Sequence, residues 1–418
     1  MTEQSTPMTI DALIVGGGIA GLWTLAKLTN AGYRALLVEK SALGSGQTIH
    51  SQGIIHGGTK YALLGKMTNA QRQIAGMPDY WRDCLAGNGE MDLGDVTCHT
   101  QAQTLWALPQ LSSRVTGFFA SHLMKSHVTK IPTADRPPVL QHHQCQGNFY
   151  ALNEPVLDVK SLLMCFANRY RHHIITDAKW QLAHPQADNA CDSTFDNNCA
   201  SDNDGDGNGD YKIVSIKTAN TTLTVKAAHI IYTAGKANAS LSNDTANQQI
   251  RPLRMVYAHV PKTFGQLYLH VLAASDKPRL TITTHPYDEQ TNIWYLGGHV
   301  AETGAHLSDS ETITLAKKEL TAIFPWLDFS QCPFASFVVD RAEGSHAGNR
   351  PDTPVVHSDS QTIVAWPTKL AMAPMLADAI VAMVARLSPT NPPQTNTAHT
   401  APPTFATPRI ANYPWECN

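Results

Sequence analysis

The sequence lacks the features of a secreted or membrane-spanning protein. Its start, MTEQSTPMTIDALIVGGG, has no basic region, no apolar stretch of signal-peptide type and no small-residue cleavage site. No apolar run reaches the ~20 residues that a spanning helix needs, because the most apolar stretch, LAMAPMLADAIVAMVA, contains Pro374 and Asp378. The eight cysteines include no Cys-x-x-Cys pair. We therefore expect free thiols and a cytoplasmic location, with peripheral membrane association left open.

A strong charge of either sign is also absent. The 418 residues carry 31 basic and 34 acidic side chains, so the net charge is −3. No overall field of the protein therefore favours nucleic acid as a partner. Apolar residues make up 43% of the chain and charged residues 16%, which is ordinary for a globular protein of two or three domains.

A complete β-α-β pattern is present near the start, in IDALIVGGGIAGLWTLAKLTNAGYRALLVEK (10–40). Gly16, Gly18 and Gly21 follow an apolar run of strand length, a helical pattern comes next, and a second apolar run ends at Glu39. In this motif the glycines permit a tight turn, the approach of a pyrophosphate and close packing of helix on strand. The terminal acid accepts hydrogen bonds from a ribose diol. The pattern therefore predicts a dinucleotide-binding domain.

The motif by itself does not separate FAD from NAD, although an acid at position 39 argues against the 2′-phosphate of NADP. The next segment, SALGSGQTIHSQGIIHGGTKYAL (41–63), has little periodicity where a nicotinamide dehydrogenase would have a further β-α-β unit. Such a segment buries few apolar groups, so its backbone donors and acceptors need other partners. A long cofactor lying along it would supply them.

The two segments together resemble the FAD-dependent oxidoreductases grouped with D-amino-acid oxidase, glycine oxidase and sarcosine dehydrogenase. HSQGIIHGG is similar to the His-Asn-Ser-Gly-Val-Ile-His-Ala-Gly stretch of the L-2-hydroxyglutarate dehydrogenases, and IIHGGTKYAL to a stretch of the flavin-linked glycerol-3-phosphate dehydrogenases. Further matches follow in the family's order at 154–171, 227–238, 250–261, 292–304, 347–356 and 362–384. At 366–370 the chain has Trp-Pro-Thr-Lys-Leu instead of the family's glycine-rich turn.

The resemblance implies a set of residues near the flavin. We expect FAD to contact Gly16, Gly18, Ile19, Ala20, Gly21, Glu39, Lys40, Thr48, His50, Ser51, Gln52, Gly53, Ile54, Ala234, Gly235, Thr368, Lys369 and Leu370. His50 falls where the sarcosine and dimethylglycine dehydrogenases carry a histidine bonded covalently to the flavin. A covalent bond here stays open but is not favoured. Retention of the yellow colour by acid-denatured protein would reveal one.

The resemblance also implies catalytic candidates. Arg350, in a Gly-x-Arg-Pro element, is expected to hold an anionic substrate group by a bidentate fork. His56 is a candidate base or substrate contact, with a loop histidine bonded to backbone as the alternative. Tyr61 is a further candidate, and Arg254, Tyr257 and His299 are secondary ones that are more often packing residues.

No metal site is predicted. His50 and His56 lie six residues apart with no cysteine or acid beside them, and this spacing fits no zinc motif. The acidic DNDGDG (202–207) matches the first half of a calcium loop but has Ile213 at the closing position, so we interpret it as part of a flexible insertion at 184–210.

These observations predict an α/β fold with a Rossmann-like FAD domain built from 8–75, 150–245 and 335–390. A second α+β substrate domain on a large mixed sheet is expected from 76–149 and 246–334, with a weakly ordered tail at 391–418. The implied reaction moves a hydride from a small anionic 2-hydroxy acid or polyol phosphate to flavin N5, with oxygen or a quinone as acceptor. An amino-acid or N-methylamine oxidase or dehydrogenase, and a flavin protein without dehydrogenase turnover, remain the alternatives.

Overall fold

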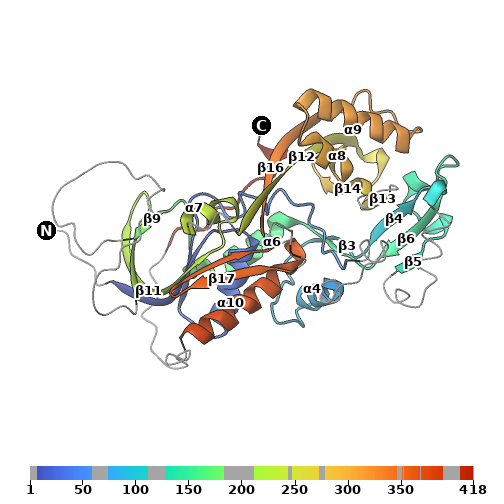
Figure 1. The fold of residues 1–418 in the computed structure, drawn as a ribbon. Helices are drawn as coiled ribbons and strands as arrows, with labels where there is room; N and C mark the ends of the chain where they lie inside the picture. Colours follow the sequence, from blue (N-terminus) through green and yellow to red (C-terminus); the bar gives the residue numbers. More distant parts are fainter. Residues whose placement is uncertain are drawn as a thin grey trace. The chain divides into compact units, whose positions relative to one another are not determined.

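The computed structural model describes most of the chain (Figure 1). The described residues are 7–58, 74–111, 128–182, 211–242, 247–272, 278–345, 351, 353–367, 369–388 and 405–417. The chain divides into two compact units. Unit 1 comprises 1–50, 163–250 and 341–417, and unit 2 comprises 51–162, 251–340 and residue 418.

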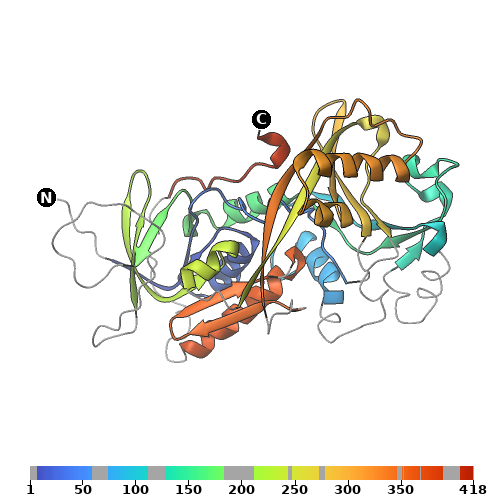
Figure 2. The ribbon, with the colours of Figure 1, turned by 45° about the horizontal axis from the view of Figure 1, so that its top comes forward.

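Unit 1 is built on a sheet whose central strands are parallel (Figures 1 and 2). The strand order is β17-β18-β11-β1-β2-β8, with β9 and β10 added beside β11. The strands are β1 (Met8–Val15), β2 (Ala35–Val38), β8 (Ile174–Ile175), β9 (Lys179–Leu182), β10 (Lys212–Lys217), β11 (Thr222–Tyr232), β17 (Val355–Asp359) and β18 (Thr362–Trp366). The central strands are almost fully buried apolar runs, as parallel strands covered on both faces are.

Two helices of unit 1 pack on one another beside this sheet. These are α1 (Ile19–Asn30) and α10 (Ala373–Leu387). Residues 370–387 are long and apolar enough to cross a membrane by length and composition alone. The helix nevertheless buries Leu376, Ile380 and Val384 completely within the chain, as a core helix does.

The remaining elements of unit 1 are α6 (Val159–Arg169), which begins in unit 2, η4 (Arg171–His173), η5 (Gly235–Ala237), α7 (Asn238–Ser242), η7 (Leu370–Met372) and η8 (Pro414–Glu416). Trp23 of α1 lies against Phe166 of α6, with ring centroids 5.3 Å apart. The helix predicted after the glycine loop is confirmed as α1, which ends at Asn30.

The parallel strands of unit 1 bring four connections to one edge of the sheet. Residues 16–18 follow β1, Glu39 follows β2, 233–235 follow β11, and 367, 369 and 370 follow β18. Strand β1 pairs with β2, the next strand in the sequence, on one side and with β11 on its other side. The carboxyl edge of an open parallel sheet at such a switch point is where this architecture binds ligands.

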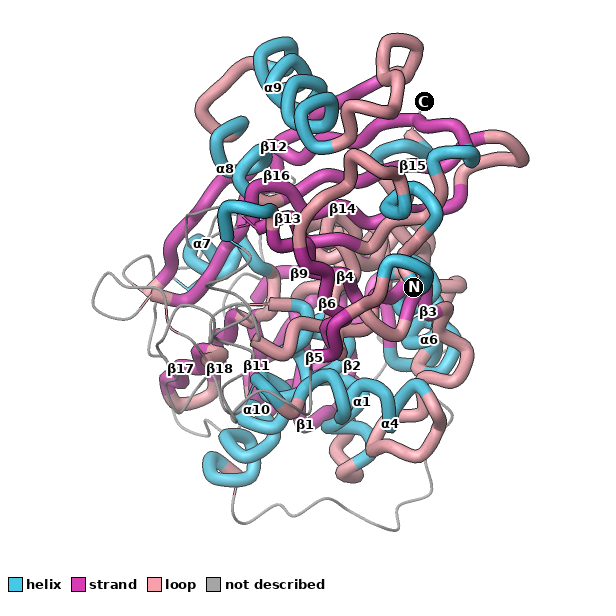
Figure 3. The backbone as a smooth tube through the Cα atoms, turned by 90° about the vertical axis from the view of Figure 1, so that its right-hand side faces the viewer, coloured by secondary structure: helices cyan, strands magenta, loops and turns pink. Residues whose placement is uncertain are grey.

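Unit 2 contains a large mixed sheet in the order β16-β12-β15-β14-β13-β4-β6-β5 (Figure 3). Its strands are β4 (Gln103–Ala107), β5 (Val128–Lys130), β6 (Asn148–Leu152), β12 (Gln248–Pro261), β13 (Leu269–Leu272), β14 (Pro278–Pro286), β15 (Thr291–Gly297) and β16 (Phe334–Gly344). The pairing of β13 with β4 is parallel and the pairings around them are antiparallel. The predicted α/β class with a second α+β part on a mixed sheet is confirmed.

Helices and a short two-stranded sheet complete unit 2. They are α4 (Met77–Leu85), α8 (His299–Gly304), α9 (Asp309–Ile323), the 3₁₀ turns η1 (Pro109–Leu111), η2 (Thr133–Asp135), η3 (Pro138–Gln141) and η6 (Lys262–Phe264), and the strands β3 (Cys98–Thr100) and β7 (Val156–Leu157). Helix α9 starts at a capping box formed by Ser308 and Glu311. The core between sheet and helices is aromatic, with Trp106, Phe149, Trp294 and Phe324 buried together.

The unit boundaries differ from the predicted domain boundaries by a few residues at 246–250 and 335–340 and by longer segments at two further places. Residues 51–58 and 150–162, assigned from the sequence to the cofactor domain, belong to unit 2. The physical reason is a β-bridge between Ile54 and Val156 and the hydrogen bond from the Leu157 N–H to the Gly53 carbonyl, 2.9 Å long. These contacts attach both segments to β3 and β7.

The end of the chain is more ordered than predicted. Residues 405–417, assigned from the sequence to a weakly ordered tail, pack on unit 1. Ile410 forms a β-bridge with Leu43, and the rings of Tyr413 and Trp415 are buried and stacked 4.6 Å apart. Periodicity does not predict this packing, because the partner of the tail is a loop and not a periodic element. The predicted insertion at 184–210 lies outside the described residues.

Candidate functional site

The glycine loop of unit 1 has a shape that excludes larger residues. Gly16 has φ +113°, and a Cβ added there would lie 2.7 Å from the Ala234 Cα. A Cβ on Gly21 would lie 2.0 Å from the Gly16 carbonyl oxygen, which means that α1 and the loop are in close contact. The same contacts bring Ala234, predicted from a distant part of the sequence, against the first glycine, and Gly235 follows it with φ +59°.

The start of α1 lies beside a polar side chain from the second glycine-rich segment. The Thr48 Oγ1 accepts the N–H of Ile19 at 3.0 Å, and Gly18 before it is extended. The first N–H groups of a helix have no partners within the helix, and with the helix dipole they favour an anion. Thr48 therefore takes the Ile19 N–H, and the N–H groups of Ala20 and Gly21 follow in the first turn, the part of a helix that binds a pyrophosphate in this motif.

Glu39 is held in place by its neighbours. Its Oε2 accepts the Gly17 N–H at 2.7 Å, and its Oε1 accepts the Ser41 N–H at 3.0 Å and hydroxyl at 3.1 Å. A carboxylate offers about four acceptor positions, so one remains for a ribose hydroxyl. Ser41 is a residue that the sequence analysis did not single out. Lys40, which lies between Glu39 and Ser41 in the sequence, is exposed.

The loop from Ser41 to His50 folds back onto the glycine loop. The Gly44 N–H donates to the Gly17 carbonyl at 2.9 Å, and the Ile49 N–H donates to the Gly44 carbonyl at 3.0 Å. His50 ends this segment, and burial lowers the pKa of its imidazole despite a hydrogen bond to the Gly46 backbone. The unit 1 part of the predicted flavin-binding loop therefore ends at the neutral imidazole of His50. On the same sheet edge, Lys369 and Leu370 follow β18.

The next four predicted cofactor residues belong to unit 2. Gln52 donates its Nε2 hydrogen to the Tyr295 carbonyl at 2.9 Å, and Ile54 bridges to Val156. Gly53 has φ +69°, and a Cβ there would lie 2.1 Å from the Leu157 carbonyl oxygen. The close contact with the backbone of Leu157 is therefore enough to require glycine at position 53. The Ser51 Oγ is shielded from solvent and has no hydrogen-bond partner among the described residues, so it is available to a ligand.

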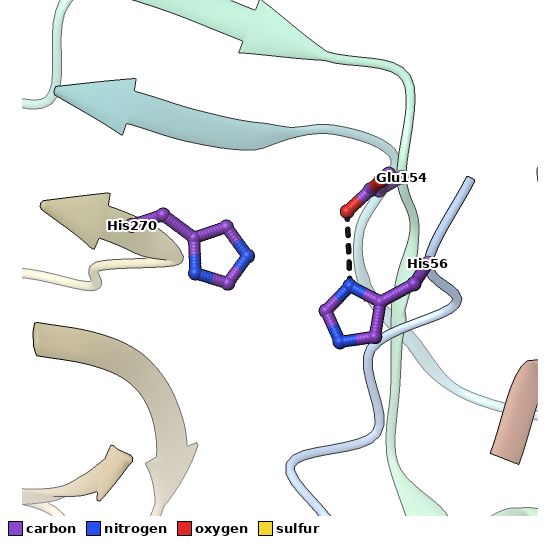
Figure 4. Close-up of side chains that lie close together, drawn as sticks. All are labelled: His56, Glu154 and His270. Atoms are coloured by element: carbon purple, nitrogen blue, oxygen red, sulfur yellow. Dashed lines mark hydrogen bonds and ion pairs between the residues drawn. The ribbon is translucent and has the colours of Figure 1, made fainter. Parts of the chain in front are cut away.

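His56 is paired with a buried acid (Figure 4). Its Nδ1 lies 3.2 Å from the Glu154 Oε2. The Glu154 side chain is only 2% exposed, and its Oε1 accepts the Gly57 N–H at 2.8 Å. An ionised carboxylate cannot donate a hydrogen bond, so the Nδ1 facing it carries a proton, and in the neutral imidazole the Nε2 then has the lone pair. The pair has the arrangement of a base held by an orienting acid.

A second histidine faces this pair. The His270 ring on β13 is stacked on the His56 ring with centroids 5.9 Å apart, and Figure 4 shows its Nε2 side turned toward Glu154 and His56. The His270 Nδ1 lies 2.9 Å from the Thr281 Oγ1 of β14. Sequence reasoning did not single out Glu154 or His270. The available signal for Glu154 was one acid between the two short apolar strands of LNEPVL (152–157).

The remaining catalytic and cofactor candidates either lie outside the described residues or make local contacts. Arg350, Tyr61 and Thr368 lie outside the described residues. The three secondary candidates take part in local structure: Arg254 pairs with Asp309 and donates to the Gly304 carbonyl, the Tyr257 ring packs on His259 and Phe337, and the His299 Nε2 meets the Thr303 Oγ1 at 3.2 Å.

Comparison with known proteins agrees with the fold and the glycine loop. The family model described as FAD dependent oxidoreductase (DAO) matches residues 11–172. The chain is 36% identical over 417 residues, 98% of each chain, to the Probable FAD-dependent oxidoreductase PA4991 of Pseudomonas aeruginosa. The crystal structure of that protein covers 99% of both chains with a TM-score of 0.78.

Two more distant solved structures share the fold. L-alpha-Glycerophosphate Oxidase from Mycoplasma pneumoniae, with FAD bound, is 15% identical, covers 93% of this chain and 97% of its own, and has a TM-score of 0.60. L-amino acid deaminase from Proteus vulgaris is 14% identical, covers 94% and 93%, and has a TM-score of 0.61. The residues around Gly16, Glu39 and Thr48 fit the dinucleotide that these comparisons imply.

Proposed function

Because this chain belongs to the DAO family of FAD-dependent oxidoreductases, we propose that it oxidises the CH–OH group of a small anionic 2-hydroxy acid or polyol phosphate. FAD, when bound, supplies the acceptor for the hydride that leaves the substrate carbon. The residues proposed to hold it are the glycine loop, Glu39 and Thr48 in unit 1, with His50 and Ser51 at the end of the following segment. We propose that FAD is held without a covalent bond.

The His56–Glu154 pair is the observation that carries this proposal. When an alcohol is oxidised, its carbon loses a hydride and its oxygen loses a proton, and a carbonyl forms. We propose that the His56 Nε2 accepts this proton while the buried Glu154 carboxylate holds the Nδ1. A base so oriented contributes about 10²–10⁴-fold to the rate.

The same pair favours an alcohol over an amine. An alcohol holds its proton tightly at neutral pH, so an enzyme needs a base to remove it as the hydride leaves. An amine already carries a lone pair once its ammonium proton is lost to solvent, and it has less need of such a base. Amine chemistry remains the alternative, since both an L-amino acid deaminase and a glycerophosphate oxidase share this fold.

The anionic group of the substrate is assigned to Arg350. A guanidinium keeps its charge at any physiological pH and matches a carboxylate or phosphate with two parallel hydrogen bonds. Tyr61 is proposed as a further substrate contact. Electrons then leave for oxygen or a quinone.

Anaerobic bleaching of the bound flavin tests the substrate class. We expect 2-hydroxy acids or polyol phosphates to bleach the flavin of the purified protein, and amino acids and N-methylamines not to do so. Bleaching by amines alone would exclude the proposal, and bleaching by none of the panel would favour a flavin protein without dehydrogenase turnover. Reoxidation by oxygen or by a soluble quinone then identifies the acceptor.

Two substitutions test the role of the pair once a substrate is found. His56→Asn should lower kcat by about 10²–10⁴-fold with the FAD content unchanged. Glu154→Gln presents an amide N–H to the Nδ1, so the proton moves to the Nε2, and kcat should fall with little change in KM. Glu289→Gln, an exposed acid of unit 2, is the control. An unchanged kcat in His56→Asn would exclude His56 as the base.

A further inference from the structure

A second cluster of histidine and carboxylate side chains lies in unit 2, apart from His56 and Glu154. His99 comes from β3, Asp158 from the turn between β7 and α6, and His285 from β14. One potential ligand atom of each residue lies within 4.8 Å of the others. Three elements far apart in the sequence thus direct two imidazoles and one carboxylate to one point.

The distances in this cluster differ from those of the His56–Glu154 pair. The His99 Nε2 is 3.6 Å from the Asp158 Oδ2, beyond hydrogen-bonding distance, whereas the His56 Nδ1 is 3.2 Å from Glu154. Two ligands of a tetrahedral zinc ion, each about 2.1 Å from the metal, lie ~3.4 Å apart. The separation of His99 and Asp158 therefore suits two ligands of one ion better than a direct hydrogen bond.

The cluster is buried, and one of its polar atoms lacks a partner. The His99 side chain is only 7% exposed and His285 is 2% exposed. Among the described residues, the His99 Nε2 has no hydrogen-bond partner although it is shielded from solvent. A buried polar atom without a partner is costly, and a bound cation would satisfy it. The Asp158 side chain is 21% exposed, so an ion has a route to the site.

Neighbouring groups hold the donors in place. The His285 Nε2 lies 3.5 Å from the Thr283 Oγ1, which orients the His285 ring. The Asp158 Oδ1 accepts the Ser161 N–H at 2.6 Å, which orients the carboxylate. The His99 ring is supported by the Tyr268 ring, stacked 6.0 Å away.

We propose that His99, Asp158 and His285 bind a divalent transition-metal ion that joins β3, the start of α6 and β14. Two imidazoles and a carboxylate suit Zn²⁺, and three protein ligands leave a fourth position for water. This site is separate from the proposed substrate chemistry. Its role is to stabilise unit 2, because an ion that binds only the folded protein raises its stability.

The test is a zinc titration of the FAD-containing protein after dialysis against a chelator. We expect one Zn²⁺ per chain by calorimetry and elemental analysis, with an increase in the melting temperature. Asp158→Asn should weaken binding by at least about tenfold. This variant should fold, because the asparagine Oδ1 still accepts the Ser161 N–H. His99→Ala should weaken binding at least as much.

Two control variants separate this cluster from the other histidines. His56→Asn alters the cluster of His56, Glu154 and His270, and His143→Gln alters the exposed member of the His142–His143 pair. Both variants should keep full zinc affinity. Wild-type protein without stoichiometric zinc would overturn the proposal. Loss of zinc in His56→Asn, with retention in His99→Ala and Asp158→Asn, would overturn it as well.

Discussion

Single glycines of unit 1 decide whether the dinucleotide loop can form. Gly21 lies in the first glycine-rich segment and Gly46 lies in the second, and the surroundings of the two residues differ. A Cβ on Gly21 would overlap the Gly16 carbonyl oxygen, whereas a Cβ on Gly46 would meet nothing within 4 Å. The sequence motif predicted the requirement at Gly21, but only the packing distinguishes the two positions.

Gly21→Ala should therefore destabilise unit 1 and weaken FAD binding. Pushing α1 away from the loop costs roughly 1–3 kcal/mol, as overpacking typically does, and it moves the helix N-terminus away from the pyrophosphate. Gly46→Ala is the matched control and should leave both properties unchanged. Urea unfolding and the FAD content of the purified variants measure the effect. Equal behaviour of the two variants would contradict the prediction.

Helices α1 and α10 are joined by an ion pair with one buried partner. Lys27 of α1 forms an ion pair with Asp378 of α10, and the Lys27 side chain is only 4% exposed while Asp378 is 60% exposed. From the sequence, Pro374 and Asp378 interrupted an apolar run. In the structure Pro374 lies in the first turn of α10, where proline is tolerated, and Asp378 pairs with the lysine. Both residues belong to the helix.

Removal of one charge should cost more than removal of both. Asp378→Ala leaves the buried ammonium of Lys27 without this carboxylate, which should destabilise the protein by about 3 kcal/mol. Lys27→Met with Asp378→Ala replaces the pair by apolar groups and should restore most of that loss. Urea unfolding of the single and double variants tests this. Additive losses in the double variant would show that the pair is not coupled.

At the scale of the whole molecule, the end of the chain completes the segment next to the glycine loop. The Leu43 N–H donates to the Arg409 carbonyl at 2.8 Å, and the Ala411 N–H donates to the Leu43 carbonyl at 3.0 Å. Leu43 in turn precedes Gly44, whose N–H donates to Gly17. The C-terminal segment and the predicted flavin loop are thus connected through one residue.

Removal of residues 405–418 should lower the melting temperature by about 4–8 °C, because at least two backbone hydrogen bonds to the rest of the chain and the burial of two aromatic rings, Tyr413 and Trp415, are lost. The shortened protein should also retain less FAD during gel filtration. Arg409→Ala breaks only the exposed ion pair with Asp177 and should change the melting temperature by less than about 2 °C. Full FAD retention by the shortened protein would contradict the connection.

The sequence by itself determined the β-α-β unit, the glycine loop and the family, and it singled out His56 as a candidate. These depend on local periodicity and on residues close together in the chain, which a reader of the sequence can see. Only the tertiary structure decided that Glu154, 98 residues away, holds His56, and that His99, Asp158 and His285 converge. Strand order and register set such contacts, and no short stretch of sequence records which strands will be neighbours.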